Sequence, residues 1–308
     1  MNLLRPLLLW GSTNEWLCRT VPKMHFVRRA SKRFIPGETL ESALTAAFSL
    51  SGNNILTIFT HLSENIKSLH EADIVTEHYI TSLERIGELH LHAHLSLKLT
   101  QLGLDLSVEK TFSNFIRIAQ RAKQLNKIVW IDMEGSTYTQ ITIEIFRRVC
   151  EIADNVGICL QAYLYRTAKD LKILSPLSPH VRLVKGAYRE SSTVAYSKKE
   201  DVDRNYTTLM EIMLDAALKD NLKPVFATHD TRIINGLRQL AASRALDINK
   251  FEIHMLYGIR SSDQKKLSEE GFRVGVLISY GEAWFPWYMR RLAERPANIG
   301  FVVKNLFK

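Results

Sequence analysis

The amino-acid sequence predicts an α/β protein: a closed, somewhat distorted (β/α)8 barrel with a helical arm at its N-terminus. From about residue 52, short apolar runs rich in β-branched residues alternate with amphipathic stretches, the pattern of parallel βα units. Eight such runs fill roughly 250 residues, the usual size of this barrel. No GxGxxG follows the first run, which argues against an open dinucleotide-binding sheet. The predicted strands span residues 55–60, 94–99, 128–134, 157–164, 181–187, 224–230, 251–257 and 274–280.

The segments between the runs show helical periodicity. Within residues 201–220, Leu209, Ile212, Met213 and Leu214 recur at spacings that make one apolar helix face. Such a stripe is typical of core packing, and we assign it no functional role.

Composition favours one large domain. The chain has 308 residues, 46% hydrophobic and 24% charged, and no Gly/Ser/Pro-rich run interrupts its middle. We therefore expect an arm over residues 1–37 and a barrel over residues 38–308. The 41 Lys and Arg residues exceed the 32 Asp and Glu by 9, which suits anionic ligands, but no RNA-binding signature accompanies them. We expect no nucleic-acid partner.

Cysteine usage and the first residues bear on location. Cys18, Cys150 and Cys159 form no CxxC pair, which indicates neither a disulfide framework nor a metal site. The opening MNLLRPLLLW is too short for a membrane span and lacks a small-residue cleavage site. We expect a bacterial-type cytoplasmic protein that is not secreted, with an arm that covers the barrel. The alternative is an arm that rests peripherally on the inner membrane.

Polar residues cluster where the predicted strands end, which is where barrel enzymes carry their active sites. They are Lys98, Asp132, Glu134, Gln161, Arg182, Lys185, Thr228, His229 and Asp230, followed by Arg290 and Arg291 in the helix after the last strand. So many cations near Asp132 and Glu64 would be costly in a packed core unless ligands neutralise them. Two adjacent arginines offer forked donors to a carboxylate, although an isolated pair is usually a solvated helix face. The pattern predicts an anion site.

Several segments occur in the order and on the strands expected of one family. They are RFIPGETL (33–40), LSLKLTQLGLD (95–105), IDMEGS (131–136), QAYLYRT (161–167), VRLVKGAYRE (181–190), FATHD (226–230), YGEAWFPWYMRRLAERPAN (280–298) and FVVKNLF (301–307). In these segments the chain resembles the FAD-dependent, monofunctional proline dehydrogenase family. The resemblance implies hydride transfer from L-proline to flavin N5, giving 1-pyrroline-5-carboxylate, with electrons passed to a quinone-type acceptor.

The resemblance also implies which residues hold the cofactor. Arg182 is expected beside flavin N5 and Gln161 at the polar edge of the ring, while Lys185, Gly186 and Ala187 line the ribityl and pyrophosphate. The implied FAD contacts are Met133, Gln161, Arg182, Lys185, Gly186, Ala187, Thr228 and His229.

A second set is implied for the substrate. Lys98, Arg290 and Arg291 are expected to bind its carboxylate, and Leu256 and Leu277 to line its pocket. Asp132, counted with Arg182 as catalytic, is expected to pair with Lys98. Glu64 and Arg290 would form an ion pair that closes the last helix over the site. For each of these residues the alternative is a structural ion pair or a strand-end hydrogen bond.

The last strand departs from the family pattern. RVGVLISYG (273–281) has Leu277 where the family has a tyrosine of the substrate pocket, and Ser279 where it has a proline. Losing a phenol removes a donor and an aromatic face, so a substituted ring such as 4-hydroxyproline is an alternative substrate. Smaller departures are Thr60 for an aspartate, His254 for a glutamine and Arg189 for an aromatic residue.

Two other classes compete. LHLHAH (89–94) contains the HxH of barrel metal-dependent hydrolases, but it opens its strand, no second ligand set completes it, and we expect no metal. A catalytically silent barrel is the second alternative. The absence of GxSxG argues against a serine hydrolase.

Overall fold

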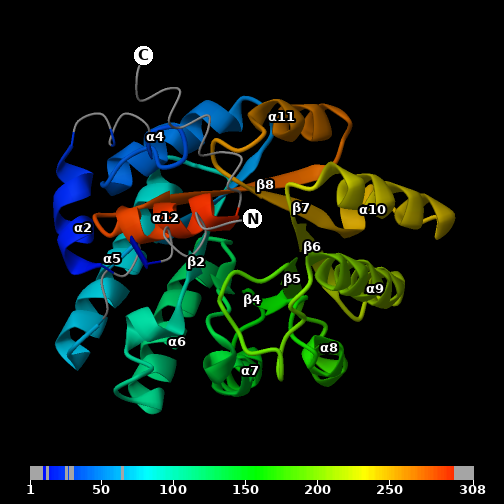
Figure 1. The fold of residues 1–308 in the computed structure, drawn as a ribbon, viewed down its shortest axis with the longest axis horizontal. Coiled ribbons are helices and arrows are strands. Elements are labelled where there is room, and N and C mark those ends of the chain that lie inside the picture. Colours follow the sequence, from blue (N-terminus) through cyan, green and yellow to red (C-terminus); the bar gives the residue numbers. More distant parts are fainter. Residues whose placement is uncertain (1–9, 12–13, 25–26, 28–30, 64–65, 295–308) are drawn as a thin grey trace.

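The computed structural model describes residues 10–11, 14–24, 27, 31–63 and 66–294. Eight parallel strands form a closed barrel in sequence order, from β1 beside β2 round to β8 beside β1 (Figure 1). They are β1 (Leu56–His61), β2 (Ala93–Leu97), β3 (Val129–Ile131), β4 (Val156–Gln161), β5 (His180–Val184), β6 (Lys223–Ala227), β7 (Glu252–Leu256) and β8 (Arg273–Tyr280). The predicted barrel and all eight predicted strands are confirmed.

Helices surround the barrel (Figure 1). They are α2 (Glu15–Thr20), α4 (Leu40–Ser51), α5 (Leu69–Glu88), α6 (Val108–Gln124), α7 (Ser136–Cys150), α8 (Thr167–Leu174), α9 (Lys199–Leu218), α10 (Thr231–Ser243), α11 (Ser261–Glu269) and α12 (Trp284–Glu294), with short 3-10 helices η1 (Val21–Lys23), η2 (Leu99–Leu102), η3 (Ser175–Leu177) and η4 (Ile248–Lys250). Local caps set several helix starts: Ser68 and Ser107 accept backbone N–H bonds at the start of α5 and α6, and Asp230 does so for α10. The helix predicted over residues 201–220 is α9. Leu209, Met213 and Leu214 of its predicted apolar stripe are buried, whereas Ile212 is 42% exposed.

Large rings fill the barrel interior because the strands next to them carry glycine: Gly157 on β4 is the register partner of Trp130 on β3, and Gly275 on β8 is the register partner of His254 on β7. A Cβ at Gly157 would lie 2.5 Å from the ring of Trp130, and one at Gly275 would lie 2.5 Å from the ring of His254. Trp130 packs with Leu56, Ile58 and Val225 on the inward faces of the strands. The glycines thus admit rings that a packed interior would otherwise exclude.

Polar side chains occupy the amino end of the barrel. His254 Nε2 lies 2.9 Å from Glu252 Oε2, and Arg273 pairs with Glu252 at 2.5 Å. His94 Nδ1 accepts the backbone N–H of Ile128 at 3.1 Å, which leaves the proton on Nε2. The HxH imidazoles therefore lie at the strand starts, away from the catalytic end of a barrel. Among the described residues, no three His, Cys, Asp or Glu side chains form a group suited to a metal ion.

Buried imidazoles make the fold sensitive to acid. Burial lowers the pKa of His94 to about 3 and that of His61 and His180 to about 4. These groups stay neutral when folded but take up protons near pH 6.5 when unfolded. The contribution of these groups to the free energy of unfolding is therefore fully present above about pH 6.5 and is lost as the pH drops towards about 4. The loss is up to about 1.4 kcal/mol per pH unit for each proton taken up.

We predict that His94→Asn reduces this loss, because Asn has no proton to gain and its amide oxygen lies close to the position of the imidazole Nδ1, where it can still accept the Ile128 N–H. Urea denaturation from pH 7.5 to 4 measures the slope. An identical slope in wild type and variant would exclude His94 as a source.

The N-terminal segment packs against the last helix. A second apolar cluster joins Leu17, Cys18 and Val21 to Phe285 and Tyr288 of α12, and Figure 1 shows α2 (dark blue) beside α12 (red). Trp284 Nε1 donates to Glu38 Oε1 at 3.0 Å. The arm thus holds α12 from one side. None of the helices in the described part of the chain has the length and apolar character needed to cross a bilayer.

Candidate functional site

Arg182 is a buried charge inside the barrel with several polar partners. It lies on β5 with only 3% of its surface exposed. Its Nη2 donates to Asp132 Oδ1 and to Ser96 Oγ, both at 2.6 Å, and its Nε donates to Cys159 Sγ at 2.8 Å. The guanidinium carbon lies 4.9 Å from the ring centroid of Trp130. One cation is therefore held by hydrogen bonds on two nitrogens and by an aromatic face.

Asp132 connects this cation to the open end of the barrel. It directly follows β3, its backbone N–H donates to Leu97 O at 2.8 Å, and its side chain is 24% exposed. Oδ1 also accepts from Ser96 Oγ at 2.9 Å and lies 3.5 Å from Cys159 Sγ. An ion pair links Asp132 to Arg182. The expected pairing of Asp132 with Lys98 stays a prediction.

Lys98 stands where β2 ends and η2 begins. Its backbone N–H donates to Gln101 Oε1 at 3.2 Å. Close by, Glu134 accepts from Thr100 Oγ1 at 2.9 Å and from the Thr100 N–H at 3.3 Å. Burial raises the pKa of the Glu134 carboxyl, and the charge of Lys98 opposes that rise. The sequence placed Glu134 at the carboxyl end of a strand but assigned it no role. Its hydrogen bonds to Thr100 hold the turn that carries Lys98.

Gln161 is the last residue of β4, and its side-chain amide is only partly hydrogen-bonded by the described residues. The residue is 3% exposed, its Nε2 donates to Met133 O at 3.4 Å, and its Oε1 has no hydrogen-bond partner among the described residues. A buried amide oxygen without a donor is costly and calls for an explanation. A ligand that brings an N–H to this point would satisfy it.

The chain after β5 turns through a glycine that no other residue replaces easily. Gly186 has φ of +112°, and a Cβ there would lie 2.3 Å from the ring of Tyr163. Lys185 before it donates to Asp203 and lies 3.3 Å from Asp230. Ala187 follows it. The segment therefore presents bare backbone and one ammonium.

Thr228 and His229 follow β6 and are tied to β7. The Thr228 N–H donates to His254 O at 3.1 Å, and Thr228 Oγ1 accepts the Asp230 N–H at 3.1 Å. His229 Nε2 accepts the N–H of Leu256 at 2.8 Å, so its proton is on Nδ1.

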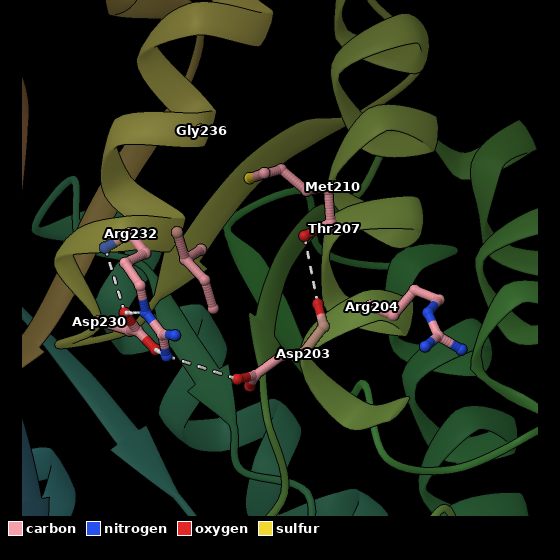
Figure 2. Close-up of a pocket in the computed structure, with 8 residues that line it drawn as sticks. Asp203, Arg204, Thr207, Met210, Asp230, Arg232 and Gly236 are labelled. Atoms are coloured by element: carbon pink, nitrogen blue, oxygen red, sulfur yellow. Dashed lines mark hydrogen bonds and ion pairs between the residues drawn. The ribbon is translucent and has the colours of Figure 1, made fainter. Parts of the chain in front are cut away.

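A pocket of about 300 Å³ opens between α9 and α10, next to the partners of Lys185 (Figure 2). Figure 2 shows Arg232 between Asp230 and Asp203, with ion-pair distances of 3.0 and 3.8 Å. The hydrogen bond from Arg232 lowers the pKa of Asp230. Met210 and Ile233 add apolar wall. The residue patterns did not reveal this pocket, because its walls come from two consecutive helices whose spacing is set by the packing of the barrel.

Two leucines on neighbouring strands face the barrel interior. Leu256 on β7 and Leu277 on β8 are register partners, and both are partly exposed. Leu277 packs with the interior cluster that contains Leu56 and Ile58. Ser279 is the next residue on the same face of β8; it is 1% exposed and its hydroxyl has no partner among the described residues.

Three expected residues fall where the structure gives no side-chain account. Glu64 lies outside the described residues. Arg290 and Arg291 belong to α12 by their backbone, but their side chains are also outside the described part. The expected gate pair and the expected arginine contacts with the carboxylate remain predictions.

Ser96 and Cys159 were missed by the sequence reasoning. Strand alternation could have found them, since Ser96 shares a face with Lys98 and Cys159 shares one with Gln161. Small residues inside apolar runs draw no attention until a partner from another strand reaches them.

Comparisons with known proteins agree with this architecture. The family model described as proline dehydrogenase matches residues 43–304. Proline dehydrogenase 1 of Bacillus subtilis (strain 168) is 39% identical over 306 residues, which cover 99% of this chain and 100% of that protein. The proline dehydrogenase of Deinococcus radiodurans is 37% identical over 283 residues, 90% of each chain.

Solved structures show the same fold. Proline utilization A from Bdellovibrio bacteriovorus, inactivated by N-propargylglycine, superposes with a TM-score of 0.80 at 21% identity, covering 93% of this chain. A Bradyrhizobium japonicum proline utilization A variant gives 0.74 at 20% identity over 90% of this chain. This chain spans 38% and 32% of those longer proteins. By the family match and its full-length relatives, the chain belongs to the proline dehydrogenase family of oxidoreductases.

Proposed function

We propose that this protein oxidises L-proline at its CH–NH bond to 1-pyrroline-5-carboxylate, or a close ring analogue to the corresponding cyclic imine, with FAD as hydride acceptor. The observation that carries the proposal is Arg182, a buried cation held by three polar partners at the heart of a barrel of this family. A fixed charge of this kind stabilises negative charge that arrives beside it.

The chain's residues fit a flavin dinucleotide in three respects. Gln161 has a buried amide oxygen that no described residue hydrogen-bonds, and a ring N–H would satisfy it. Gly186 lets a ligand approach bare backbone, and the Lys185 ammonium beside it, which pairs with Asp203 and Asp230, is the cation that would meet a pyrophosphate. When bound, FAD supplies the hydride acceptor that no side chain can provide. We assign the remaining contacts to Met133, Ala187, Thr228 and His229.

The chain's own side chains then bind the substrate and orient the charged groups around it. Asp132 holds Arg182 in place through their 2.6 Å ion pair. Lys98, Arg290 and Arg291 bind the substrate carboxylate, and Glu64 pairs with Arg290 to bring α12 over the site. Burial beneath α12 would exclude water and strengthen these interactions.

Substrate choice rests on the wall made by Leu256 and Leu277. Leu277 is apolar and packs among aliphatic residues, so the pocket lacks the phenol that the family pattern places there. A ring that carries an extra substituent, such as 4-hydroxyproline, is the alternative substrate.

Electrons are proposed to leave through a quinone-type acceptor. The protein would work in a bacterial-type cytoplasm, with the arm of residues 1–37 available for peripheral contact with the membrane and the barrel of residues 38–308 carrying the chemistry. The net charge of +9 suits an anionic lipid surface.

One experiment tests the substrate and the cofactor together. The purified protein is expected to show a flavin spectrum that L-proline bleaches without oxygen; trans-4-hydroxy-L-proline is the parallel arm. The compound that bleaches faster names the substrate, and a soluble quinone should restore the colour. A protein that stays colourless after refolding with FAD would favour the catalytically silent barrel.

Arg291→Ala is expected to raise KM for the substrate by about 10- to 100-fold, because hydrogen bonds to a charged group contribute about 1.5–3 kcal/mol. Flavin content should change little. Steady-state kinetics and the ratio of flavin to protein absorbance measure both quantities. Parallel loss of flavin would remove Arg291 from the substrate site.

A further inference from the structure

We propose that Ser96 and Cys159 are positioning residues that hold the Arg182 guanidinium at one orientation for the flavin. The inference rests on the proposed function, and it adds two residues to the site that neither the family resemblance nor the comparisons assign.

The four side chains form a closed ring of contacts. Arg182 donates to Ser96 at 2.6 Å and to Cys159 at 2.8 Å. Ser96 donates onward to Asp132 Oδ1 at 2.9 Å, and the Cys159 thiol points to the same oxygen at 3.5 Å. Each small residue therefore bridges the cation and the carboxylate. The two bridges act on different nitrogens, Nη2 and Nε, so together they oppose rotation of the guanidinium plane.

Strand geometry brings these residues together. Cys159 and Arg182 are register partners on β4 and β5, Ser96 lies on β2, and Asp132 leaves β3. Four consecutive strands thus contribute to one cluster. Ser96 is fully buried and Cys159 is 3% exposed, so water cannot easily replace either partner.

The thiol acts as a hydrogen-bond bridge. Burial raises the pKa of Cys159 to about 12, so the group keeps its proton. An S–H can donate to Asp132 while the sulfur accepts from Arg182 Nε. A low-pKa thiolate would be required for nucleophilic chemistry, and this environment disfavours it.

The cluster matters because a buried guanidinium has few ways to replace a lost partner. An unsatisfied N–H of a buried cation is costly, and the side chain would turn or draw in water to recover it. Either response would move positive charge relative to the ligand. The effect should therefore appear in the rate of the chemical step and in the flavin potential, with little change in substrate affinity.

The test compares Cys159→Val with Cys159→Ser. Valine is close in volume to cysteine and cannot accept a hydrogen bond, whereas serine keeps both a donor and an acceptor. We expect Cys159→Val to lower kcat about tenfold, equivalent to about 1.4 kcal/mol, with KM within about twofold. Its flavin midpoint potential should become more negative, because a less well placed cation stabilises the reduced flavin less. Cys159→Ser should behave like wild type.

Two further variants sharpen the comparison. Ser96→Ala should lower kcat and the potential in the same direction, and its effect should be non-additive with that of Cys159→Val because both act on Arg182. Cys150→Ser is the matched control. It changes a partly buried cysteine at the end of α7 and should leave the flavin potential unchanged.

A measurement on the arginine itself separates this inference from the proposed function. With ¹⁵N-arginine labelling, the Arg182 Nε–H should exchange slowly in wild type and in Cys159→Ser, and faster in Cys159→Val. This signal does not require flavin. Unchanged exchange and potential in Cys159→Val would overturn the inference, as would a lower melting temperature with no change in either. A wild-type protein that shows the protected signal but never reacts with a cyclic imino acid would instead overturn the proposed function alone.

Discussion

Replacing Arg182 by methionine is expected to lower kcat by about 10²- to 10³-fold, the usual effect of removing one preorganised donor from a site of developing charge. The same change leaves the Asp132 carboxylate without its cation and should lower the free energy of unfolding by about 3 kcal/mol. Both effects follow from the burial of Arg182 and its contacts with Asp132, Ser96 and Cys159. Rapid-mixing flavin reduction and urea denaturation measure them separately.

Arg182→Lys is the control for charge alone. A lysine keeps the cation but lacks the fork that reaches Ser96 and Cys159 together, so it should recover stability better than it recovers rate. A methionine variant that retains more than about a third of wild-type kcat would exclude Arg182 from the chemical step, since that corresponds to less than about 0.7 kcal/mol of barrier.

Gly186→Ala is expected to weaken FAD binding by about 10- to 100-fold, which corresponds to about 1.4–2.7 kcal/mol. At φ of +112° an alanine is strained, and its Cβ would lie 2.3 Å from the Tyr163 ring. The backbone between Lys185 and Ala187 must shift to relieve the clash, and this is the segment proposed to contact the cofactor. Fluorescence titration of the refolded protein with FAD measures the loss.

Gly236→Ala supplies the matched control. Gly236 lies on α10, where a Cβ would meet no atom within 4 Å beyond its chain neighbours and the backbone of its own helix, and its φ is not positive. Alanine should stabilise that helix by about 0.5–1 kcal/mol and leave FAD affinity unchanged. Adding Tyr163→Ala to Gly186→Ala removes the clash but not the strain, so affinity should recover only in part. Full affinity in Gly186→Ala alone would show that the cofactor does not use this segment.

The fold was predictable from residue patterns because each element buries one face locally. The eight apolar runs and the stripe of α9 are properties of neighbouring residues, and both were confirmed apart from the exposed Ile212. Strand ends were less predictable. The run 128–134 was predicted as strand throughout, but β3 spans only Val129–Ile131. Hydrophobicity does not mark where the hydrogen-bond ladder stops, and residues beyond it, such as Asp132, leave the sheet to reach the site.

The candidate site was predictable in part. Arg182 and Asp132 were identified by their motifs, yet the contact between them was not foreseen, because the sequence argument paired Asp132 with Lys98. His254 was noticed only as a departure from a family glutamine, and in the structure it lies 2.9 Å from Glu252. Such pairings depend on which strands are neighbours and which residues align across them.

The sequence by itself determined the barrel class, the strand order and the residue types at the strand ends. Hydrophobic periodicity and the order of the motifs are properties of the linear sequence, so they can be recognised without the fold. Only the tertiary structure decided that Ser96 and Cys159 bridge Arg182 to Asp132, that Gly186 must accommodate Tyr163, and that a pocket opens between α9 and α10. The reason is physical. Hydrogen bonds and steric contacts between distant residues depend on register and closure of the barrel to within about 1 Å, and no local pattern encodes that distance.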